Sequence, residues 1–505
     1  MSRAIPGNLS QPRDPLFSPK TAARSIRCIV ADRRFLFAAT ALFYAVFFVF
    51  MTKNGLKSYF SQDDLLNIYY CWSRSLSHLL LGGTVIAGNA YRPAGELLYD
   101  ALFALFGFHP AAFNVVRLIL CCVDAGLLYL FARRISNSVE VGVLALLIGG
   151  FHPGTHPLYF DTGMIFDVLA FLFFYAALAV YVRSRSGGAF PSRAKSVLVL
   201  ALYLLALDSK EIAVTFPIAL FLFELTRGEE GVAASFRSGR GFLRKFRITA
   251  IATLMTAVFI VARSSGPEAL VKIGAYHPKI SAAAYVGSYA RYMAELTFLD
   301  ERAIQPLVPW ILGGCIALSV PLRNRTMLWA SLFNVFSILP LAFIPPRAGF
   351  AFAVPLAGWT VYCAALVAWL RARIVSRKPR LEWLSQAVVF CLIAFFLLRP
   401  EAAYMRDNVR PFVHDDQNFV RRTIESLHTV LPAKLVNKRV LALRDPFRNG
   451  YGLIFAIQLS YNDPSVTVDT FKLLELRREP ISRVGYDYVI DWTGERFVGV
   501  QNPGP

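Results

Sequence analysis

The chain has 505 residues, of which 56% are hydrophobic, and its mean hydropathy is +0.48. This composition excludes a soluble globular domain, which cannot bury so much apolar surface, and indicates an α-helical polytopic membrane protein. The formal net charge of +20 at pH 7 does not indicate nucleic-acid binding, because the basic residues lie in loops between apolar segments and not in an aromatic-interleaved motif.

Residues 1–33 are rich in Arg, Ser and Pro and precede the first apolar segment. No small-residue cleavage site directly follows that segment, so we predict a retained anchor behind a cytoplasmic N-terminal segment. The seven cysteines lie mostly in apolar stretches, with no CxxC pair or cluster with histidine. We therefore expect neither a disulfide framework nor a zinc site.

Residues 34–400 form the predicted transmembrane domain. A helix needs about 20 apolar residues to cross the hydrocarbon layer. On this basis we predict about 11 transmembrane helices, at residues 34–52, 111–132, 139–157, 163–182, 196–207, 212–226, 247–264, 304–322, 326–344, 349–370 and 382–399. The two short segments at 196–207 and 212–226 are predicted to form a hairpin whose turn, residues 208–211, approaches the membrane surface.

The loops between these segments give the orientation. Basic residues gather around 133–134, 183–195, 237–247, 323–325 and 371–380, and such loops are typically cytoplasmic. All of them face the cytoplasm only if the segment 92–108 does not cross the membrane. Its alternation of Glu96 and Asp100 with apolar residues favours an amphipathic helix on the outer surface. The loop of residues 52–110 is then extracytoplasmic.

Two further regions complete the predicted organisation. Residues 280–298 carry Tyr285, Tyr289 and Tyr292 at near-helical spacing and are predicted to form a second surface helix. Residues 401–505 mix acids and bases evenly and alternate short apolar runs with helix-like stretches. We predict a small extracytoplasmic α/β domain there, without a phosphate loop or a nucleophile elbow.

The adjacent carboxylates of Asp63 and Asp64 directly follow the first apolar segment. Carboxylates at a membrane boundary are suited to deprotonating a hydroxyl group, so these two are the predicted catalytic residues. The predicted topology brings further polar residues to the same outer face, and we predict that they bind substrate: Arg92, His152, His156, Asp161, Lys210, Glu211 and Arg347.

Structural roles are the alternative for several of these residues. Asp63, Asp64 or Asp161 could cap a helix, since aspartate is favoured at helix N-termini. Arg92-Pro93 could begin a helix with proline in its first turn and a snorkelling arginine. The two His-Pro pairs, at 152–153 and 156–157, could be loop residues at a helix end.

The remaining two positions also leave alternatives open. Lys210 and Glu211 could form a surface ion pair that contributes little. A lysine in a turn at the membrane surface is nevertheless well placed to neutralise a phosphate, with the glutamate orienting it. Arg347 could be an interfacial arginine, but it lies on the outer face, where basic residues are few, and this favours a phosphate contact.

Several short motifs lie between residues 55 and 370. They are Tyr91-Arg92-Pro93, Phe106-Gly107-Phe108-His109-Pro110, Asn114, Leu127-Leu128-Tyr129-Leu130, Phe151-His152-Pro153, Ser209-Lys210-Glu211 with Pro217, and Arg347-Ala348-Gly349-Phe350-Ala351-Phe352 with Pro355 and Gly358. Together they resemble GT-C glycosyltransferases of the protein O-mannosyltransferase type, in particular the transmembrane mannosyltransferases that carry tetratricopeptide repeats.

The resemblance implies an inverting transfer of a sugar from a polyprenyl-phosphate carrier to an acceptor hydroxyl, on the face away from the cytoplasm. It implies that Asp63 is the general base and that Asp64 supports it or contacts the sugar. Lys210 and Arg347 would bind the donor phosphate, with Arg92 as a further candidate.

The chain departs from the family pattern in three places. Thr155-His156-Pro157 stands where an acidic residue usually follows the His-Pro motif, and Gly349 and Ala351 replace aromatic residues after the late arginine. No tetratricopeptide repeats follow the last apolar segment. The sugar, mannose in the family, and the acceptor, whether protein, lipid or glycan, therefore stay open.

The expected partners are the lipid-linked sugar donor, the acceptor and membrane lipids, and the expected location is a bacterial inner membrane. A lipid monophosphate donor requires no cofactor, although adjacent carboxylates could hold a divalent metal.

A transporter or flippase of a lipid-linked sugar is an alternative, but it would place charges near the bilayer midplane and show repeated halves. A catalytically silent scaffold whose outer domain binds a partner is the third reading.

Overall fold

The computed structural model describes residues 53–81, 92–150, 152–185, 189–227, 239–265, 272, 277–345, 349–480 and 482–500, with isolated helical positions between 38 and 50. The chain divides into two compact units, residues 1–51 and 52–505, and the second contains the elements described below. The predicted N-terminal segment 1–33 lies outside the described residues, and the predicted span 34–52 is described only at isolated positions.

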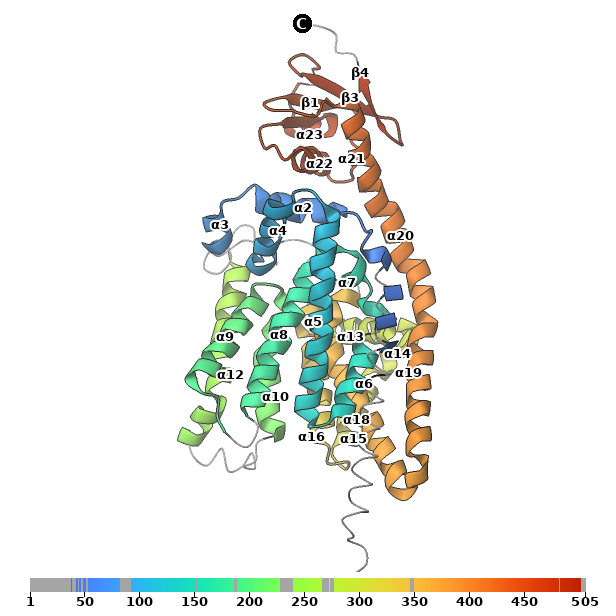
Figure 1. Cartoon of the computed structure of the whole chain (residues 1–505). Coiled ribbons are helices and arrows are strands. Elements are labelled where there is room, and N and C mark those ends of the chain that lie inside the picture. Colours follow the sequence, from blue (N-terminus) through green and yellow to red (C-terminus); the bar gives the residue numbers. More distant parts are fainter. Residues whose placement is uncertain are drawn as a thin grey trace, which may run out of the picture. The chain divides into compact units, whose positions relative to one another are not determined.

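Long apolar helices lie side by side in the second unit (Figure 1). Helix α5 (Pro110–Ser136) packs on α6 (Val139–Gly150) and α8 (Ile165–Ser184), and α18 (Ala353–Arg377) packs on α6. Helix α6 is shorter than the predicted span of 139–157. Pro153 and Pro157 lack a backbone N–H and instead start two short helices, η1 (Pro153–Thr155) and α7 (Pro157–Phe160).

A second set of helices packs beside α8. Helix α9 (Arg193–Leu207) contacts α8, and α10 (Phe216–Arg227) contacts α12 (Gly239–Ser264). Between α9 and α10, residues 208–210 make a tight turn that leads into the 3-10 helix η4 (Glu211–Thr215). The predicted short hairpin is therefore present, and its turn carries Lys210 and Glu211.

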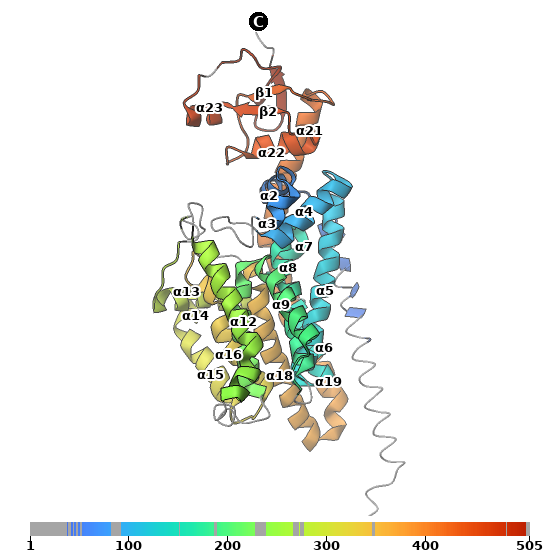
Figure 2. The same cartoon turned by 90° about the vertical axis from the view of Figure 1, so that its left-hand side faces the viewer.

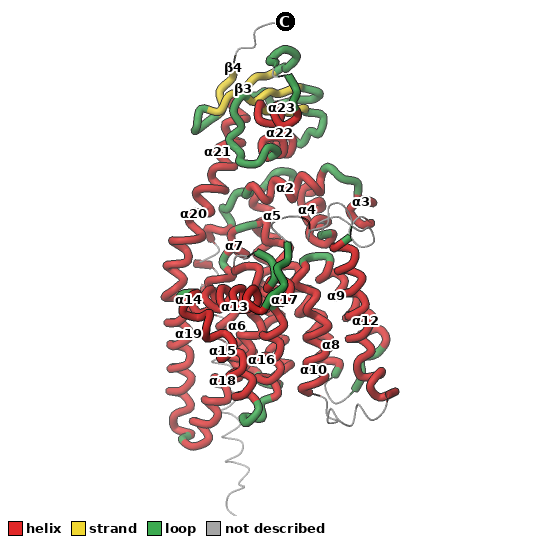
Figure 3. Tube along the Cα trace, turned by 180° about the vertical axis from the view of Figure 1, so that it is seen from behind, coloured by secondary structure: helices red, strands yellow, loops and turns green. Residues whose placement is uncertain are grey.

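The segment from 282 to 352 holds the remaining helices of the bundle. They are α13 (Ala282–Thr297), α14 (Glu301–Ile304), η7 (Gln305–Leu307), α15 (Val308–Ser319), α16 (Arg325–Ser337), α17 (Leu339–Ala342) and η8 (Gly349–Phe352). Helix α13, the predicted second surface helix, runs across the direction of α15 and α16 (Figure 3). Its Tyr289 and Tyr292 are buried against α15, α17 and η8.

Six segments among the described residues are long and apolar enough to cross a membrane, and they indicate an integral membrane protein. They are Pro110–Ser136, Thr162–Ser184, Arg244–Ser264, Arg325–Ala342, Ala353–Arg377 and Pro379–Leu397. The predicted eleven spans are not confirmed. Several predicted spans correspond to helices of 10 to 17 residues, such as α6, or are interrupted by short 3-10 turns.

The predicted outer loop contains three helices. They are α2 (Gln62–Trp72), α3 (Leu76–Leu81) and α4 (Pro93–Phe106), and the last corresponds to the predicted surface helix of residues 92–108. Helix α4 packs on α2 and α8. The backbone of Gly95 approaches α8 so closely that a Cβ atom at this position would lie 2.2 Å from the ring of Phe166.

We expect Gly95→Ala to destabilise the protein by about 1–3 kcal/mol, because the added methyl group would have to displace a rigid aromatic ring. The matched control is Gly126→Ala in α5, where an added Cβ would meet nothing within 4 Å. The melting midpoint in detergent should fall for Gly95→Ala and stay unchanged or rise for the control. Equal midpoints for the two variants would contradict this account of the α4–α8 contact.

A nearly continuous helical run connects the bundle to the C-terminal sheet. It comprises α19 (Glu382–Tyr404), the π-helical segments η10 (Met405–Val409) and η11 (Val413–Gln417), which flank α20 (Arg410–Phe412), and α21 (Asn418–Val430). The boundary predicted at residue 401 therefore falls inside α19, and the first strand begins only at Arg439.

The C-terminal region forms a small mixed sheet with two helices. Its elements are β1 (Arg439–Ala442), α22 (Gly452–Tyr461), β2 (Thr467–Thr470), α23 (Phe471–Arg477), β3 (Tyr488–Trp492) and β4 (Phe497–Val500). The strand order is β2-β1-β3-β4, with β1 parallel to β2 and β3, and β4 antiparallel to β3. An α/β arrangement matches the sequence prediction.

The sheet region shares a hydrophobic core with the outer loop. Helix α22 lies between the sheet and α2 (Figure 2), and the ring of Tyr69 stacks on that of Phe455 with centroids 4.2 Å apart. Leu65 and Ile68 of α2 belong to the same buried cluster as Ile457 of α22. The C-terminal region therefore holds α2, the helix that carries the predicted catalytic pair, in place.

Candidate functional site

Asp64 is buried in the first turn of α2, where it completes a capping box with Ser61. The Ser61 backbone N–H donates to Asp64 Oδ2 at 2.9 Å, and the Asp64 N–H donates to Ser61 Oγ at 3.2 Å. The hydroxyl of Tyr99 in α4 lies 3.2 Å from Asp64 Oδ1. Asp64 thus takes the capping role that the sequence left as an alternative, and its side chain faces the protein interior.

Asp161 lies beside this pair. Ser61 Oγ is 3.1 Å from Asp64 Oδ2 and 3.2 Å from Asp161 Oδ1, so one hydroxyl bridges two carboxylates that are 0% and 4% exposed. Asp161 also accepts from the Gly163 N–H at 3.0 Å. Burial and the charge of Asp161 raise the pKa of Asp64 well above its usual range. Burial raises the pKa of Asp161 to about 6. The arrangement favours a pair that shares a proton.

Arg117 of α5 is fully buried beneath these carboxylates. Its Nη2 donates to the carbonyl of Tyr159 at 2.8 Å and to that of Gly55 at 3.3 Å, and its Nη1 donates to Thr162 Oγ1 at 3.4 Å. Its positive charge favours the ionised forms of Asp64 and Asp161. Arg117 was not among the site residues predicted from the sequence. Its position inside a predicted span could have identified it, because an arginine at membrane depth is costly and usually has a function.

Asp63 differs from its neighbour because its side chain is exposed. No hydrogen bond or ion pair joins it to another residue in the described part of the chain. Nearby groups still remove part of its hydration, and this desolvation, together with the charge of Asp416, raises the pKa of Asp63. Of the adjacent carboxylates, Asp63 is therefore the one that can meet a substrate.

Asp416 comes from the helical run that leads to the C-terminal sheet. Its Oδ2 accepts from the Gln62 backbone N–H at 3.1 Å, and its Oδ1 accepts from Gln62 Nε2 at 2.6 Å. The next residue, Gln417, is buried and donates to the carbonyl of Phe160 at 2.7 Å. A carboxylate at a helix N-terminus satisfies unpaired N–H groups and suits the helix dipole. Asp416 thus fixes the first turn of α2, including Asp63.

Lys210 and Arg92 form a second group with acidic partners. Arg92, at the start of α4, makes a bidentate pair with Glu211: Nε donates to Oε1 at 3.2 Å and Nη2 to Oε2 at 2.9 Å. Lys210 Nζ contacts Asp167 in the first turn of α8. Burial would raise the pKa of Glu211, but Arg92 and Lys210 together lower it to about 2, so Glu211 is ionised.

Further charged residues surround this group. Arg263, in the last turn of α12, interacts electrostatically with Glu211, Asp208 and Glu96. Burial raises the pKa of Glu96 to about 7 and that of Asp208 to about 6. Buried carboxyls of this kind can take up protons when a second anion approaches. The cluster of Arg92, Lys210 and Arg263, hereafter the cationic cluster, is thus suited to accommodating a phosphate.

Aromatic side chains of α4 and α8 connect the carboxylates to the cationic cluster. Tyr99, which contacts Asp64, has its ring centroid 5.7 Å from that of Phe166. The guanidinium carbon of Arg92 lies 5.3 Å from the same Phe166 ring. Helix α4 therefore carries contacts to both groups. The start of α8 also lies near both, because Asp161 precedes this helix by four residues and Asp167 is in its first turn.

The two predicted histidines form a third, separate group. His152 Nδ1 accepts from the Gly154 N–H at 3.1 Å, and His152 Nε2 lies 3.0 Å from the carbonyl of Leu296. Burial lowers the pKa of His152. His156 is buried with its Nε2 3.8 Å from Glu401. These contacts hold His152 at the start of η1 and His156 beside Glu401. Arg347 lies outside the described residues.

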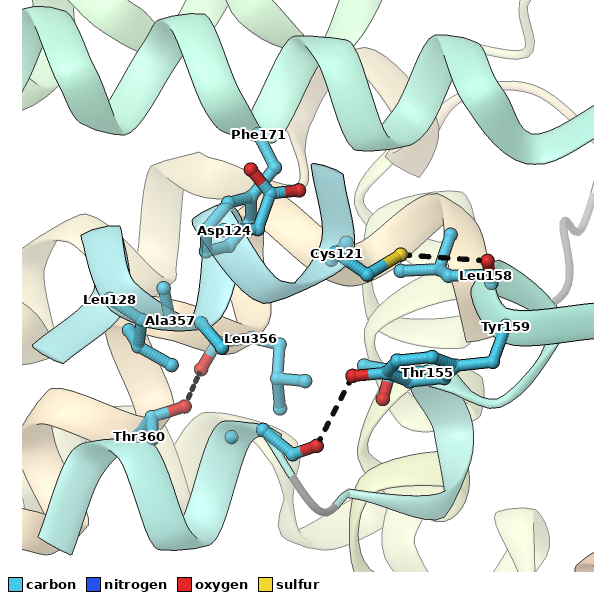
Figure 4. A pocket seen from close by; sticks show the side chains of 14 residues that line it. Cys121, Asp124, Leu128, Thr155, Leu158, Tyr159, Phe171, Leu356, Ala357 and Thr360 are labelled. Atoms are coloured by element: carbon cyan, nitrogen blue, oxygen red, sulfur yellow. Dashed lines mark hydrogen bonds between the residues drawn. The ribbon is translucent and has the colours of Figure 1, made fainter. Parts of the chain in front are cut away.

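An apolar cavity of about 50 Å³ lies between α5, α6, α7 and α18 (Figure 4). Asp124, Phe171 and Thr360 belong to its lining, and Cys121 Sγ lies 3.6 Å from the Leu158 carbonyl at its edge. None of the predicted site residues lines it. Among the described residues, no group of three or more acidic, histidine or cysteine side chains is arranged to hold a metal ion.

The sequence matches no family model and no curated protein. The structure is similar to two crystal structures of ArnT from Cupriavidus metallidurans. For the apo state the TM-score is 0.48 and the identity 13%, with 90% of this chain and 93% of that chain covered. For the form bound to undecaprenyl phosphate, the TM-score is 0.42 and the identity 14%, with 86% and 87% covered.

Proposed function

We propose that the protein is an inverting glycosyltransferase that moves a sugar from a polyprenyl-phosphate donor to an acceptor hydroxyl on the extracytoplasmic face. One observation carries this proposal: an exposed carboxylate, Asp63, is fixed at the start of α2, and the same packed unit holds the cationic cluster, which is formed by the start of α4, the turn after α9 and the last turn of α12. Displacement at an anomeric carbon requires a base near the nucleophile and stabilisation of the leaving phosphate.

In this mechanism Asp63 takes the proton of the acceptor hydroxyl as its oxygen attacks the anomeric carbon. The bond between that carbon and the phosphate oxygen breaks from the opposite face, which inverts the configuration. The electron pair of that bond stays on the leaving polyprenyl phosphate, whose negative charge is stabilised by Lys210 and Arg92. Asp63 then returns its proton to water.

The buried residues around Asp63 have a supporting role in the proposal. Asp64, Ser61 and Asp161 fix the start of α2, and Arg117 holds the carbonyl of Tyr159 next to them. No step requires a cofactor. The family resemblance of the sequence favours mannose as the sugar. The orientation given by the basic loops favours an extracytoplasmic C-terminal region, and the proposed location is a bacterial inner membrane.

Lys210→Gln is expected to weaken binding of the polyprenyl-phosphate sugar by about tenfold to a hundredfold, the range of one charge-assisted hydrogen bond. Glutamine can still donate to Asp167, so the fold should survive. Binding can be measured by the quenching of intrinsic fluorescence during titration with donor. Lys195→Gln, which changes an exposed lysine at the far end of α9, is the matched control and should leave the affinity unchanged. Equal affinities for wild type and Lys210→Gln would contradict the phosphate assignment.

Asp416→Asn is expected to shift the pH dependence of transfer. The negative charge of Asp416 contributes to the raised pKa of Asp63, so its removal lowers that pKa while asparagine keeps an acceptor for Gln62. The base must be ionised to work, so the acidic limb of the kcat/KM profile should move to lower pH. Asp415→Asn, at an exposed neighbouring residue, should leave the limb in place. An unshifted limb in Asp416→Asn would show that the acidic limb does not report the ionisation of Asp63.

A further inference from the structure

A polar pocket of about 240 Å³ lies at the ends of α8 and α12 that are remote from the cationic cluster. It is lined by Tyr181 in the last turns of α8, by Phe190 just before α9, and by Arg244, Lys245 and Arg247 near the start of α12. Tyr181 follows Asp167 by fourteen positions in α8, which corresponds to about 20 Å along a helix. This pocket is therefore separate from the cationic cluster.

Glu224, an acid that contacts the lining residue Tyr181, is already neutralised. Glu224 of α10 accepts from Tyr181 Oη at 2.7 Å and forms a bidentate pair with Arg185, whose Nε and Nη2 lie 2.6 and 2.9 Å from its oxygens. None of the residues that line the pocket is acidic. Arg244, Lys245 and Arg247 thus give it a positive charge that Glu224 does not cancel.

The basic side chains are also held in position. Arg185 Nη1 donates to the Ala189 carbonyl at 2.9 Å, which fixes the backbone next to Phe190. The guanidinium carbons of Arg185 and Arg244 lie 4.4 and 4.7 Å from the centre of the Phe190 ring. Stacking on an aromatic ring holds a guanidinium in place while its N–H groups stay available for two oxygens of a phosphate.

The pocket combines this charge with apolar walls at the ends of two candidate membrane spans. Pro191 and Ile248 line it beside the basic residues, and the spans Thr162–Ser184 and Arg244–Ser264 end and begin here. Arg244 and Arg247 are exposed, one helical turn apart, and form no ion pair with a described residue. Basic pockets between membrane helices at the cytoplasmic side suit anionic lipid head groups.

We propose that this pocket binds the phosphate of an anionic phospholipid in the leaflet opposite the proposed reaction site. Arg244 and Arg247 contact the phosphate, Lys245 adds its charge from the pocket wall, and Phe190, Pro191 and Ile248 contact the glycerol and the start of the acyl chains. The sequence-based orientation places this end of the bundle in the cytoplasm, where anionic lipids attract basic residues.

The test uses the purified full chain in neutral detergent, with phosphatidylglycerol, phosphatidylcholine or inorganic phosphate as the probe. Native mass spectrometry gives the affinity for each lipid. We expect saturable binding of phosphatidylglycerol, no comparable binding of phosphatidylcholine, and an affinity lowered about tenfold or more in Arg244→Gln/Arg247→Gln. The double variant changes only exposed side chains, and an unchanged melting midpoint without lipid would verify its fold.

The matched control is Arg377→Gln/Arg380→Gln. It removes the same charge from exposed arginines at the turn between α18 and α19, at the same end of the bundle (Figure 1). The proposal predicts that this variant retains the wild-type affinity. An equal loss in both double variants would show that only general electrostatic attraction operates, and would overturn the site. Displacement of the lipid by equimolar inorganic phosphate would identify a soluble phosphate site and overturn the lipid assignment.

Discussion

Asp63→Asn is expected to reduce sugar transfer by about 10²–10⁴-fold, the contribution typical of a positioned general base. Asparagine has nearly the same shape, and the Asp63 side chain is exposed and forms no hydrogen bond or ion pair with another described residue, so the protein should fold and bind donor as before. The measurement is kcat with a polyprenyl-phosphate sugar at saturating concentration, together with the donor Kd.

Asp64→Asn is the contrasting variant. Asp64 accepts hydrogen bonds from Ser61 and Tyr99 in the protein interior, so its replacement should lower the melting midpoint as well as the rate. A fully active Asp63→Asn enzyme would remove the base from the mechanism. If Asp63→Asn instead raises the donor Kd and leaves kcat at saturating donor unchanged, Asp63 contacts the substrate and is not the base.

Arg117→Ala is expected to have the largest effect on stability, about 3–5 kcal/mol, which is the usual result when one partner of a buried charged network is removed. The guanidinium holds the carbonyls of Tyr159 and Gly55 and lies near the buried carboxylates of Asp64 and Asp161. Without it, two carbonyl groups and the ionised form of the acid pair lose their donor and counter-charge.

The matched control for Arg117→Ala is Arg133→Ala, an exposed arginine in the last turn of the same helix. The melting midpoint in detergent should fall strongly for Arg117→Ala and little for the control. Arg117→Lys, which keeps the charge but not the forked geometry, should be intermediate. Equal midpoints for Arg117→Ala and Arg133→Ala would show that the buried arginine does not stabilise the network of carbonyls and carboxylates around it.

The sequence predicted the helical bundle well because long apolar segments have few alternatives. It was less successful where segments were short. The predicted span 139–157 ends early because Pro153 and Pro157 interrupt it, and α10 begins only at Phe216, after the 3-10 turn that starts at Glu211. Hydropathy measures the composition of a window and does not register such local backbone changes, so the number of spans could not be fixed from it.

The candidate site could also be predicted only in part. Sequence reasoning found Asp63, Lys210 and Arg92 as polar residues at the ends of spans, and the structure places the last two in one group. It could not predict which of Asp63 and Asp64 is buried, although one position along a helix turns a side chain by about 100°. That rotation exposes Asp63 and buries Asp64.

Other contacts could not be predicted because they join distant parts of the chain. Asp416 meets Gln62 across 354 positions, and Gln417 meets the Phe160 carbonyl across 257. The sequence of the C-terminal region contains no phosphate loop or nucleophile elbow and indicates no role for it. Its contacts with α2 give it one, since it fixes the helix turn that carries the proposed base.

The most direct test gives the purified protein a panel of labelled polyprenyl-phosphate sugars, with a membrane and periplasmic extract as the source of acceptors, and measures released polyprenyl phosphate. The proposed transferase predicts release from at least one donor, transfer of its label to an acceptor, and loss of both in Asp63→Asn. If no donor is cleaved, while a labelled lipid-linked sugar crosses the bilayer of proteoliposomes equally well with wild type and Asp63→Asn, the protein is a transporter and the proposed chemistry is wrong.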